Sequence, residues 1–314
     1  ATALAQHGAR IKVWYARRPT TAALAEAVAR EATAASVEVE AIPVDAPSTL
    51  WGRLWRCGQL WRRAERCFTA FAPDVVVGFG GWVSAPVVLA ARTRRIGCLV
   101  HEQNVDMGRA NQWLARWVDR VAVSFGEPTA RRHRTSAVMT GLPVRDRIGR
   151  ASRADGAARL GLRADRPTLL VLGGSQGARM LNRLMLEVAG RFSPDERRTW
   201  QLIHLTGPAD EAEVKAAYAD QQVTSWVGPF LVEMEAAYAL ADVVLTRAGG
   251  STIAELARCA LPSVLIPYPH AAGHQRANAQ LAESIGGAVM MEEGHATPER
   301  LLGAVKSILT DSRL

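Results

Sequence analysis

The chain has 314 residues, of which 48% are hydrophobic and 22% are charged. The apolar content excludes a largely disordered protein, and the length suits two domains of about 150 residues each. The formal net charge is +8, but residues 1–150 carry +10 and residues 151–314 carry −2. We therefore expect the first half to meet an anionic surface or substrate.

The cysteines and the apolar stretches argue for a cytoplasmic protein without a membrane span. Four cysteines show no C-x-x-C pattern and no metal-ligand spacing, so we expect them to be reduced. The opening residues do not have the pattern of a secretory signal. The longest apolar stretch, residues 75–91, is interrupted by glycine, serine and proline, which predicts a strand, a turn and a helix.

Short β-rich runs alternate with helical patterns along the chain, beginning with helix-like residues 1–8 and ending with a helix over 300–310. In the first half we expect strands at 11–15, 37–42, 74–78, 98–101 and 120–124. In the second half we expect them at 168–172, 201–205, 223–227, 242–245, 263–267 and 287–290. Continuous Val/Leu/Ile runs are typical of parallel strands buried on both faces. The predicted fold class is therefore α/β, with two Rossmann-like domains whose parallel sheets face each other across a cleft.

The boundary between the domains is expected in residues 141–165, which are rich in glycine, proline and charges. We divide the chain into residues 1–145 and 146–314. A new strand at 168–172 then opens a second β/α series. In such sheets ligands bind beyond the carboxyl ends of the strands.

Residues 50–68 form an amphipathic helical pattern with an unusual composition. One arc of this helix carries Trp51, Leu54, Trp55, Gly58, Trp61 and Phe68. Arginines that include Arg62 and Arg66 occupy most of the remaining surface, and Trp113 with Arg109 and Arg116 gives a shorter example. Tryptophan and arginine around an apolar stripe predict a helix at an anionic membrane surface. The basic face could also suit nucleic acid, but no recognition motif supports that partner.

Two polar segments follow neighbouring predicted strands of the first half. The segment Gly78-Phe-Gly-Gly-Trp-Val-Ser-Ala-Pro86 follows one strand, and His101-Glu-Gln-Asn104 follows the next. A single histidine is more often a core residue, but four consecutive polar side chains after an apolar strand are difficult to explain by packing. We expect both segments to face the cleft.

Two glycine-rich turns of the second half each join a buried strand to a helix. The first contains Gly173, Gly174, Ser175, Gln176 and Gly177. It matches neither G-x-G-x-x-G nor a P-loop, and a simple tight turn is the structural alternative. Free N–H groups at such helix starts attract phosphate.

The second turn is Thr246-Arg-Ala-Gly-Gly-Ser-Thr-Ile-Ala-Glu255. Glu255 lies one turn into the following helix, where a carboxylate can accept both hydroxyls of a ribose. A capping-box role toward Ser251 or Thr252 is the alternative for Glu255.

A third segment, Pro267-Tyr-Pro-His-Ala-Ala-Gly-His-Gln-Arg-Ala-Asn278, carries polar side chains suited to sugar hydroxyls. These are His270, His274, Gln275 and Asn278. The two histidines have no carboxylate or cysteine at ligand spacing, so we expect no metal site.

Five segments in this order and spacing resemble the MurG family of peptidoglycan glycosyltransferases. They are Gly80-Gly-Trp-Val-Ser-Ala-Pro86, His101-Glu-Gln-Asn104, Gly173-Gly-Ser-Gln-Gly-Ala178, Arg247-Ala-Gly-Gly-Ser-Thr-Ile-Ala-Glu255 and His274-Gln-x-x-Asn278. The resemblance implies a GT-B fold and an inverting transfer of N-acetylglucosamine from UDP-GlcNAc to the C4 hydroxyl of lipid I, an undecaprenyl-pyrophosphoryl-N-acetylmuramoyl-pentapeptide, to make lipid II. It implies no required cofactor. It also implies a peripheral enzyme at the cytoplasmic face of the plasma membrane.

The resemblance also implies roles for individual residues. Asn104 and Arg145 contact the donor, Ser175 meets its diphosphate, and Leu231 holds the uracil through its backbone. Glu255 binds the ribose, Gln275 binds the sugar, and Glu102 falls on a residue important for activity. The implied donor-binding set also contains Gly250, Ser251, Thr252, Ile253 and Ala254. Further candidates are Gly173, Gly174, Gln176, His274 and Asn278.

The sequence departs from the family in four places. Leu142 replaces the asparagine of the family's Gly-Asn-Pro-Val-Arg motif, and His274 stands where the family often has glutamine. The family opens with a strand and a Gly-Gly-Thr-Gly-Gly-His loop, which binds the acceptor pyrophosphate and supplies a candidate general base. This sequence shows neither that loop nor the family's last helical segment, so we expect a chain truncated at both ends.

Two other functions fit the same residues. One is a related GT-B transferase with another polyprenyl or glycolipid acceptor. The other is a non-catalytic subunit that binds a nucleotide sugar or docks on a membrane, which a chain without the first loop could be.

Overall fold

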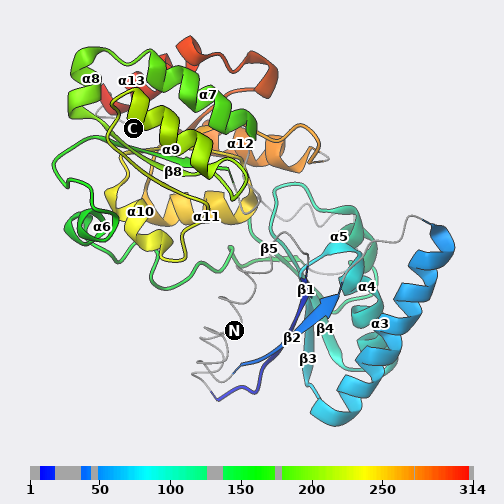
Figure 1. Ribbon diagram of the computed structural model, residues 1–314. Helices are drawn as coiled ribbons and strands as arrows, with labels where there is room; N and C mark the ends of the chain where they lie inside the picture. The colour runs from blue at the N-terminus through cyan, green and yellow to red at the C-terminus, as the bar shows by residue number, and fades with distance from the viewer. Residues whose placement is uncertain are drawn as a thin grey trace.

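The computed structural model describes residues 8–17, 37–43, 49–125, 137–173, 179–271 and 273–310. Gly174, Ser175 and Gln176, together with the helix expected at residues 1–7, lie outside these ranges. The described elements form an N-terminal half and a C-terminal half, each built on parallel strands (Figure 1).

The N-terminal half contains a strand pair and a four-stranded sheet, all parallel. The pair is β1 (Lys12–Arg17) with β2 (Glu38–Pro43), and the sheet runs in chain order through β3 (Val75–Gly78), β4 (Gly97–Glu102), β5 (Arg120–Val123) and β6 (Ala137–Met139). The helices are α3 (Leu50–Phe71), α4 (Gly81–Thr93) and α5 (Arg109–Leu114). Their buried faces form one core with the sheet, in which Ala64 and Phe68 of α3 lie with Val88 of α4.

The C-terminal half is a six-stranded parallel sheet in the order β12-β11-β10-β7-β8-β9. Its strands are β7 (Thr168–Leu172), β8 (Gln201–Leu205), β9 (Ser225–Gly228), β10 (Val243–Thr246), β11 (Ser263–Leu265) and β12 (Ala288–Met290). The chain moves outward from β7 to β9 and then returns to place β10 on the other side of β7. In sheets with such a reversal, ligands bind in a crevice beyond the carboxyl ends of the two central strands.

Helices cover both faces of this sheet. They are α6 (Arg153–Leu160), α7 (Arg179–Gly190), α8 (Pro194–Thr199), α9 (Glu211–Asp220), α10 (Met234–Leu240), α11 (Gly250–Cys259), α12 (His274–Ser284) and α13 (Pro298–Thr310), with a short 3₁₀ helix η3 (Glu293–His295). Leu169 and Val171 of β7 pack with α7, α9 and α13, whereas Leu170 and Leu172 pack with α6, α10, α11 and α12. The alternation follows from the two-residue period of a strand.

The expected α/β class with parallel sheets is confirmed, and each described expected strand is present with small shifts at its ends. The helix expected at 50–68 is α3, where the Thr49 side chain accepts a hydrogen bond from the backbone N–H of Gly52 at 3.1 Å. The helix expected at 300–310 is the end of α13. The strand β6 was not expected.

Close packing of α6 against α10 leads to a stability prediction. A Cβ atom on Gly156 would lie 2.5 Å from the carbonyl oxygen of Ala236 in α10, so Gly156→Ala must push the two helices apart. We expect the free energy of unfolding in urea to fall by about 1–3 kcal/mol. Gly303→Ala in α13 is the matched control, because nothing lies within 4 Å of its added Cβ and helix propensity favours alanine. Equal stability of Gly156→Ala and the parent would contradict the packing described here.

Candidate functional site

The two strands that precede the glycine-rich segments, β7 and β10, lie side by side at the point where the strand order reverses. Gly173 follows β7 directly, and Arg247 to Gly249 follow β10, the strand paired with β7. Helix α11 begins at Gly250, and none of the described side chains caps its first turn. The N–H groups of this turn and the helix dipole therefore form a site for an anion.

Arg247 supports the second glycine-rich turn through contacts with neighbouring segments of the C-terminal half. Its Nη1 atom lies 3.2 Å from the carbonyl oxygen of Ile266 and 2.5 Å from a carboxylate oxygen of Glu293, and its guanidinium lies over the ring of Tyr268. These contacts tie the turn after β10 to the segments after β11 and β12. Arg247 thus holds the shape of the turn.

Glu255 and Arg145 lie together at one end of the crevice. The hydroxyl of Tyr238 donates to Glu255 Oε2 at 2.8 Å, and Arg145 Nη2 lies 3.9 Å from Glu255 Oε1. Burial is the main cause that raises the pKa of Tyr238, and the negative charge of Glu255 is the second. The hydroxyl of Tyr238 therefore keeps its proton and remains a donor. The buried tyrosine fixes one oxygen of Glu255 and leaves the other toward Arg145.

Arg145 also contacts the segment expected to hold a uracil. Its Nη1 atom donates to the carbonyl oxygen of Val232 at 3.2 Å, next to Leu231. Leu231 packs against the core of the C-terminal half, while Phe230 and Val232 are exposed beside it. The structure therefore brings Arg145, Glu255 and the 230–232 segment into one place, as the resemblance implies.

The segment after β11 supplies Gln275 and His274 at the start of α12. Gln275 Oε1 accepts a hydrogen bond from the backbone N–H of Tyr268 at 2.9 Å, which orients its side chain. His274 Nδ1 lies 3.1 Å from the carbonyl oxygen of Asp106, which belongs to the N-terminal half. The start of α12 therefore lies at the junction of the two halves.

Glu102, the residue expected to be catalytic, is surrounded by hydrogen-bond donors of the protein. Its side chain is 2% exposed, and both oxygens are occupied. Oε1 accepts from the backbone N–H groups of Gln103 and Asn104 and from the Asn104 amide, all at 3.0 Å. Oε2 accepts from Gly108 N at 2.9 Å and from Asn111 Nδ2 at 2.8 Å. A carboxylate with these five donors orders the loop after β4.

Asn278, another candidate for sugar binding, is held by hydrogen bonds to protein groups. It is 1% exposed, and its amide is used entirely by protein groups. The α12 helix turns Asn278 inward, whereas Gln275 remains partly exposed. Sequence periodicity did not separate these two positions.

Comparison with known proteins adds to this geometry. The sequence matches the glycosyltransferase family 28 N-terminal domain over residues 2–123 and the C-terminal domain over residues 168–313. It is 37% identical to the UDP-N-acetylglucosamine–N-acetylmuramyl-(pentapeptide) pyrophosphoryl-undecaprenol N-acetylglucosamine transferase of Halothermothrix orenii, over 88% of this chain and 77% of that protein. The enzyme of the same name from Desulforamulus reducens is 39% identical, over 82% of this chain and 70% of that protein.

Comparison with solved structures points to the same family as the sequence comparisons. Acinetobacter baumannii MurG matches with a TM-score of 0.69 and 27% identity, over 98% of this chain and 87% of that one. The chain belongs to the MurG family of glycosyltransferases. The calicheamicin glycosyltransferase CalG4, 17% identical with a TM-score of 0.67 over 99% of this chain and 85% of that one, shows the same GT-B fold alone.

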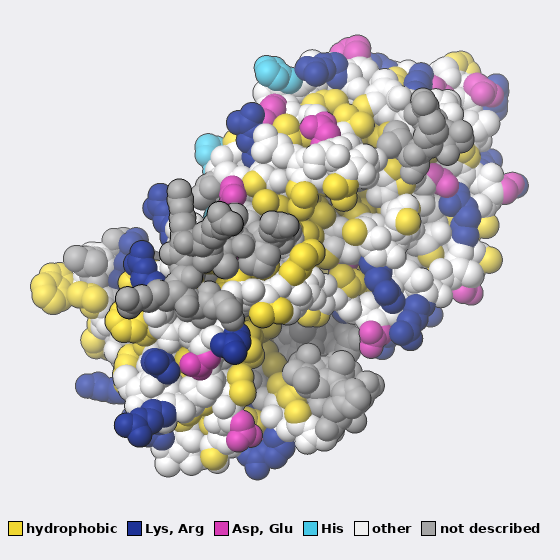
Figure 2. All heavy atoms as spheres, turned by 180° about the vertical axis from the view of Figure 1, so that it is seen from behind, with side chains coloured by type: hydrophobic (Ala, Val, Ile, Leu, Met, Phe, Trp, Pro, Cys, Tyr) yellow, Lys and Arg dark blue, Asp and Glu magenta, His cyan; other side chains and the backbone are white. Residues whose placement is uncertain are grey.

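The MurG-like chain carries an exposed apolar face on the first turns of α3. Trp51, Leu54 and Trp55 are 81%, 55% and 63% exposed. Figure 2 shows hydrophobic and basic side chains together on the edge of the molecule that α3 forms. Arg62 and Arg66 are exposed farther along the helix.

The arc of apolar residues on α3 divides into two parts. Trp61 was expected on the membrane face, but it is partly buried and packs against the core of the N-terminal half, as Phe68 does. Trp113 remains 42% exposed, and its ring centroid lies 6.3 Å from that of Trp117. The exposed apolar surface therefore consists of the first turns of α3 and this tryptophan pair.

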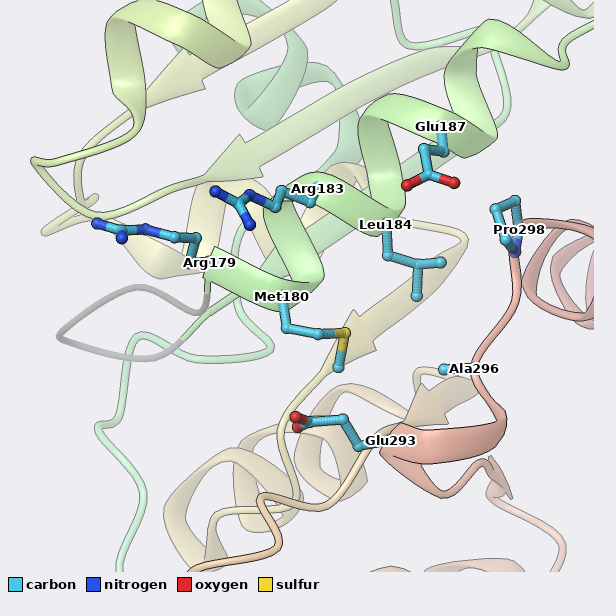
Figure 3. A pocket seen from close by; sticks show the side chains of 8 residues that line it. All are labelled: Arg179, Met180, Arg183, Leu184, Glu187, Glu293, Ala296 and Pro298. Atoms are coloured by element: carbon cyan, nitrogen blue, oxygen red, sulfur yellow. The ribbon is translucent and has the colours of Figure 1, made fainter.

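A cavity of about 400 Å³ lies between α7 and the segment that joins η3 to α13 (Figure 3). Arg179 and Arg183 stand on one side, Met180 and Leu184 form part of its floor, and Glu187 and Glu293 also line it. Two arginines and two glutamates give no net charge toward a phosphate. None of the residues that line this cavity belongs to α11.

The described ranges contain neither a membrane-spanning helix nor a cluster of metal ligands. In those ranges no helix is both long and apolar enough to cross a membrane. Among the same residues, no group of three or more His, Cys, Asp or Glu side chains is placed to hold a metal ion.

Proposed function

We propose that this chain transfers N-acetylglucosamine from UDP-GlcNAc to an undecaprenyl-pyrophosphoryl-N-acetylmuramoyl-pentapeptide, as its named relatives do. The observation that carries the proposal is the grouping of Arg145, Glu255 and the uncapped start of α11 at the strand reversal. This grouping offers a carboxylate for ribose beside an anion site for diphosphate.

The donor then lies along the carboxyl ends of the strands in the C-terminal half. Its uracil meets the backbone of Leu231, its ribose meets Glu255, and its diphosphate meets Gly250 to Thr252 at the start of α11. Gln275 reaches the sugar. Ser175, Gly174 and Gln176 of the first glycine-rich turn are proposed as further diphosphate contacts.

The chemistry needs a nucleophile, a base and a stabilised leaving group. The C4 hydroxyl of the acceptor attacks C1 of the sugar while the bond from C1 to the UDP oxygen breaks, so the configuration at C1 inverts. The α11 dipole and the guanidinium of Arg145 stabilise the charge that develops on the departing diphosphate. Glu102 orders the loop across the crevice, and its saturated carboxylate leaves the base to another group.

Two measurements test the proposal. Isothermal titration calorimetry should show binding of UDP-GlcNAc, with weaker binding of UDP-glucose. Transfer of radiolabelled N-acetylglucosamine to a lipid I analogue, and not to other polyprenyl or glycolipid acceptors, would support the acceptor assignment. Binding of the donor without transfer would point to a nucleotide-sugar-binding subunit, and the absence of donor binding would refute the proposal.

The ribose role of Glu255 predicts a loss of donor affinity in Glu255→Ala. The variant removes a charged acceptor for two hydroxyls, so we expect the Kd for UDP to rise by about 10- to 100-fold in calorimetry. Glu213→Ala on the exposed face of α9 is the control and should bind UDP as the parent does. An unchanged Kd for Glu255→Ala would show that Glu255 does not bind the ribose.

We also propose that the first turns of α3 dock on an anionic membrane at its cytoplasmic face, which makes the protein peripheral. Exposed tryptophans beside arginines suit the interface of a bilayer with acidic lipids. The acceptor is a polyprenyl lipid, so docking would bring the N-terminal half to its substrate.

The docking proposal predicts weak vesicle binding by the triple variant Trp51→Ser, Leu54→Ser, Trp55→Ser. We expect its affinity for vesicles rich in phosphatidylglycerol to fall at least about tenfold in a sedimentation assay. Ile285→Ser on the C-terminal half is the matched control, because Ile285 is 75% exposed but lies outside this face. Binding by the triple variant at the level of the parent would show that α3 does not dock.

A further inference from the structure

The loop that follows β4 crosses to the C-terminal half and contacts one buried amide there. The backbone N–H of Val105 donates to Asn278 Oδ1 at 2.8 Å. Asn278 Nδ2 donates to Asn104 Oδ1 at 3.0 Å and to the carbonyl oxygen of Ala248 at 3.0 Å. The oxygen and one hydrogen of this amide therefore join the two halves of the protein, and the other hydrogen binds Asn278 to Ala248 within the C-terminal half.

A glycine allows the same two segments to approach closely. A Cβ atom on Gly250 would lie 2.2 Å from the carbonyl oxygen of Gln103, so the loop rests directly on the first residue of α11. His274 Nδ1, 3.1 Å from the carbonyl oxygen of Asp106, adds a contact one turn before Asn278. Residues 103–106 are thus held between the starts of α11 and α12.

We propose that Asn278 is a positioning residue that closes the crevice by holding residues 103–106 against the start of α11. This inference rests on the proposed function, because it places the diphosphate of the donor at that helix start. The acceptor belongs to the N-terminal half and the donor to the C-terminal half, so the reacting atoms meet only when the halves are held in register.

The hydrogen bonds form one continuous path through the junction. Glu102 accepts from the Asn104 amide at 3.0 Å, Asn104 accepts from Asn278, and Asn278 donates to Ala248, which precedes the glycines of the second turn. Asn104, which was expected to contact the sugar donor, forms two of these hydrogen bonds while the two halves are in contact. Asparagine suits position 278 because its amide offers two donors and an acceptor at one point.

The path predicts which property changes when Asn278 is lost. The donor groups proposed above, apart from Asn104 and Arg145, belong to the C-terminal half, so binding of UDP should survive. The distance between the halves should become variable, and turnover should fall while the KM for the donor changes little.

Distances between spin labels on the two halves test this directly in the full chain. Labels at Ala70→Cys in α3 and Ala212→Cys in α9 occupy exposed helix positions, in a background where Cys57, Cys67, Cys98 and Cys259 are alanine. Electron–electron double resonance should give one narrow distance for this parent. Asn278→Ala should lower the ratio of closed to open molecules by about tenfold or more, while the Kd for UDP stays within about threefold.

Three further variants complete the experiment. Asn278→Asp keeps an acceptor for Val105 but loses both donors, so it should open the halves as well, and it remains informative if the alanine variant unfolds. Gly250→Ala should shift the distance through the Gln103 contact alone. Gln280→Ala, an exposed position on the same helix, should keep the parent's distance.

Unchanged distances in the folded Asn278 variants and in Gly250→Ala would overturn the proposal. So would a tenfold weaker UDP complex with unchanged distances, because Asn278 would then act on the donor itself. A parent that binds no UDP-GlcNAc would contradict the proposed function instead, and the label distances would still decide whether Asn278 joins the halves.

Discussion

Glu102→Ala is expected to abolish transfer and to lower the free energy of unfolding by about 3–5 kcal/mol. The change leaves the partly buried N–H groups of Gln103, Asn104 and Gly108 and the buried amide of Asn111 without their charged acceptor. Unfolding in urea measures the stability, and the radiolabel transfer assay measures the activity. Glu38→Ala, which removes a largely exposed carboxylate paired with Lys12 in the same half, should cost less than about 1 kcal/mol.

Glu102→Gln separates a positioning role from a proton-transfer role. Glutamine keeps one oxygen for the loop donors, so stability should recover in part, and the residual transfer should keep the parent's dependence on pH. A general base would behave differently, because Glu102→Gln would then abolish transfer while Glu102→Ala left the fold intact. That second pattern would restore the catalytic assignment of Glu102.

The elements that periodicity predicts best are those buried on both faces. Every residue of β7 is buried, and its unbroken apolar run marks it as a central strand. The strand β6 was not predicted because it is a three-residue edge strand in which Val138 and Met139 are 48% and 61% exposed. Its sequence therefore has neither the length nor the pattern of a buried strand.

The helix α3 shows a different limit of periodicity. The spacing of its tryptophans predicts one apolar face, and the structure has that face. What covers a face depends on the neighbouring elements, so Trp61 packs against the core while Trp51 and Trp55 extend beyond it. A pattern within one helix does not show which of its apolar residues will be covered by neighbouring elements.

The candidate site was predictable where it depends on local chain geometry. Glycine turns after buried strands predict helix starts that suit phosphate, and the second turn after β10 has that form. The pairs that fix the site are not local. Tyr238 with Glu255 and Asn104 with Asn278 join segments whose contact depends on the whole fold. A single sequence contains no signal for such long-range pairs.

A buried histidine in the C-terminal half predicts that acid destabilises the fold. His204 of β8 is fully buried, and burial lowers its pKa to about 3. Its Nε2 lies 3.0 Å from Asn182 Oδ1, and its Nδ1 lies 2.8 Å from the hydroxyl of Tyr218. Asn182 Nδ2 donates to Asp210 at 2.7 Å and to a backbone carbonyl, so its oxygen must accept from Nε2. Nδ1 then accepts from Tyr218, and the ring is neutral with every polar atom paired.

The direction of the pH effect follows from proton binding. In the unfolded chain His204 has the ordinary pKa of about 6.5 and binds a proton below that pH, whereas the folded protein does not bind it until about pH 3. The unfolded state therefore gains stability as the pH falls through this window. The contribution of His204 should lower the free energy of unfolding by about 3 kcal/mol between pH 7 and pH 4.

His204→Gln should remove this slope, because its amide can still accept from Tyr218 and donate to Asn182 but does not titrate. We expect urea unfolding at pH 7, 6, 5 and 4 to give a curve flatter than the parent's by about 3 kcal/mol. His295→Gln, at the exposed last residue of η3, should keep the parent's slope. Parallel curves for the parent and His204→Gln would show that the histidine is protonated in the folded state. The paired arrangement around Asn182 would then be wrong, since a protonated ring would present two donors and could not accept from Tyr218.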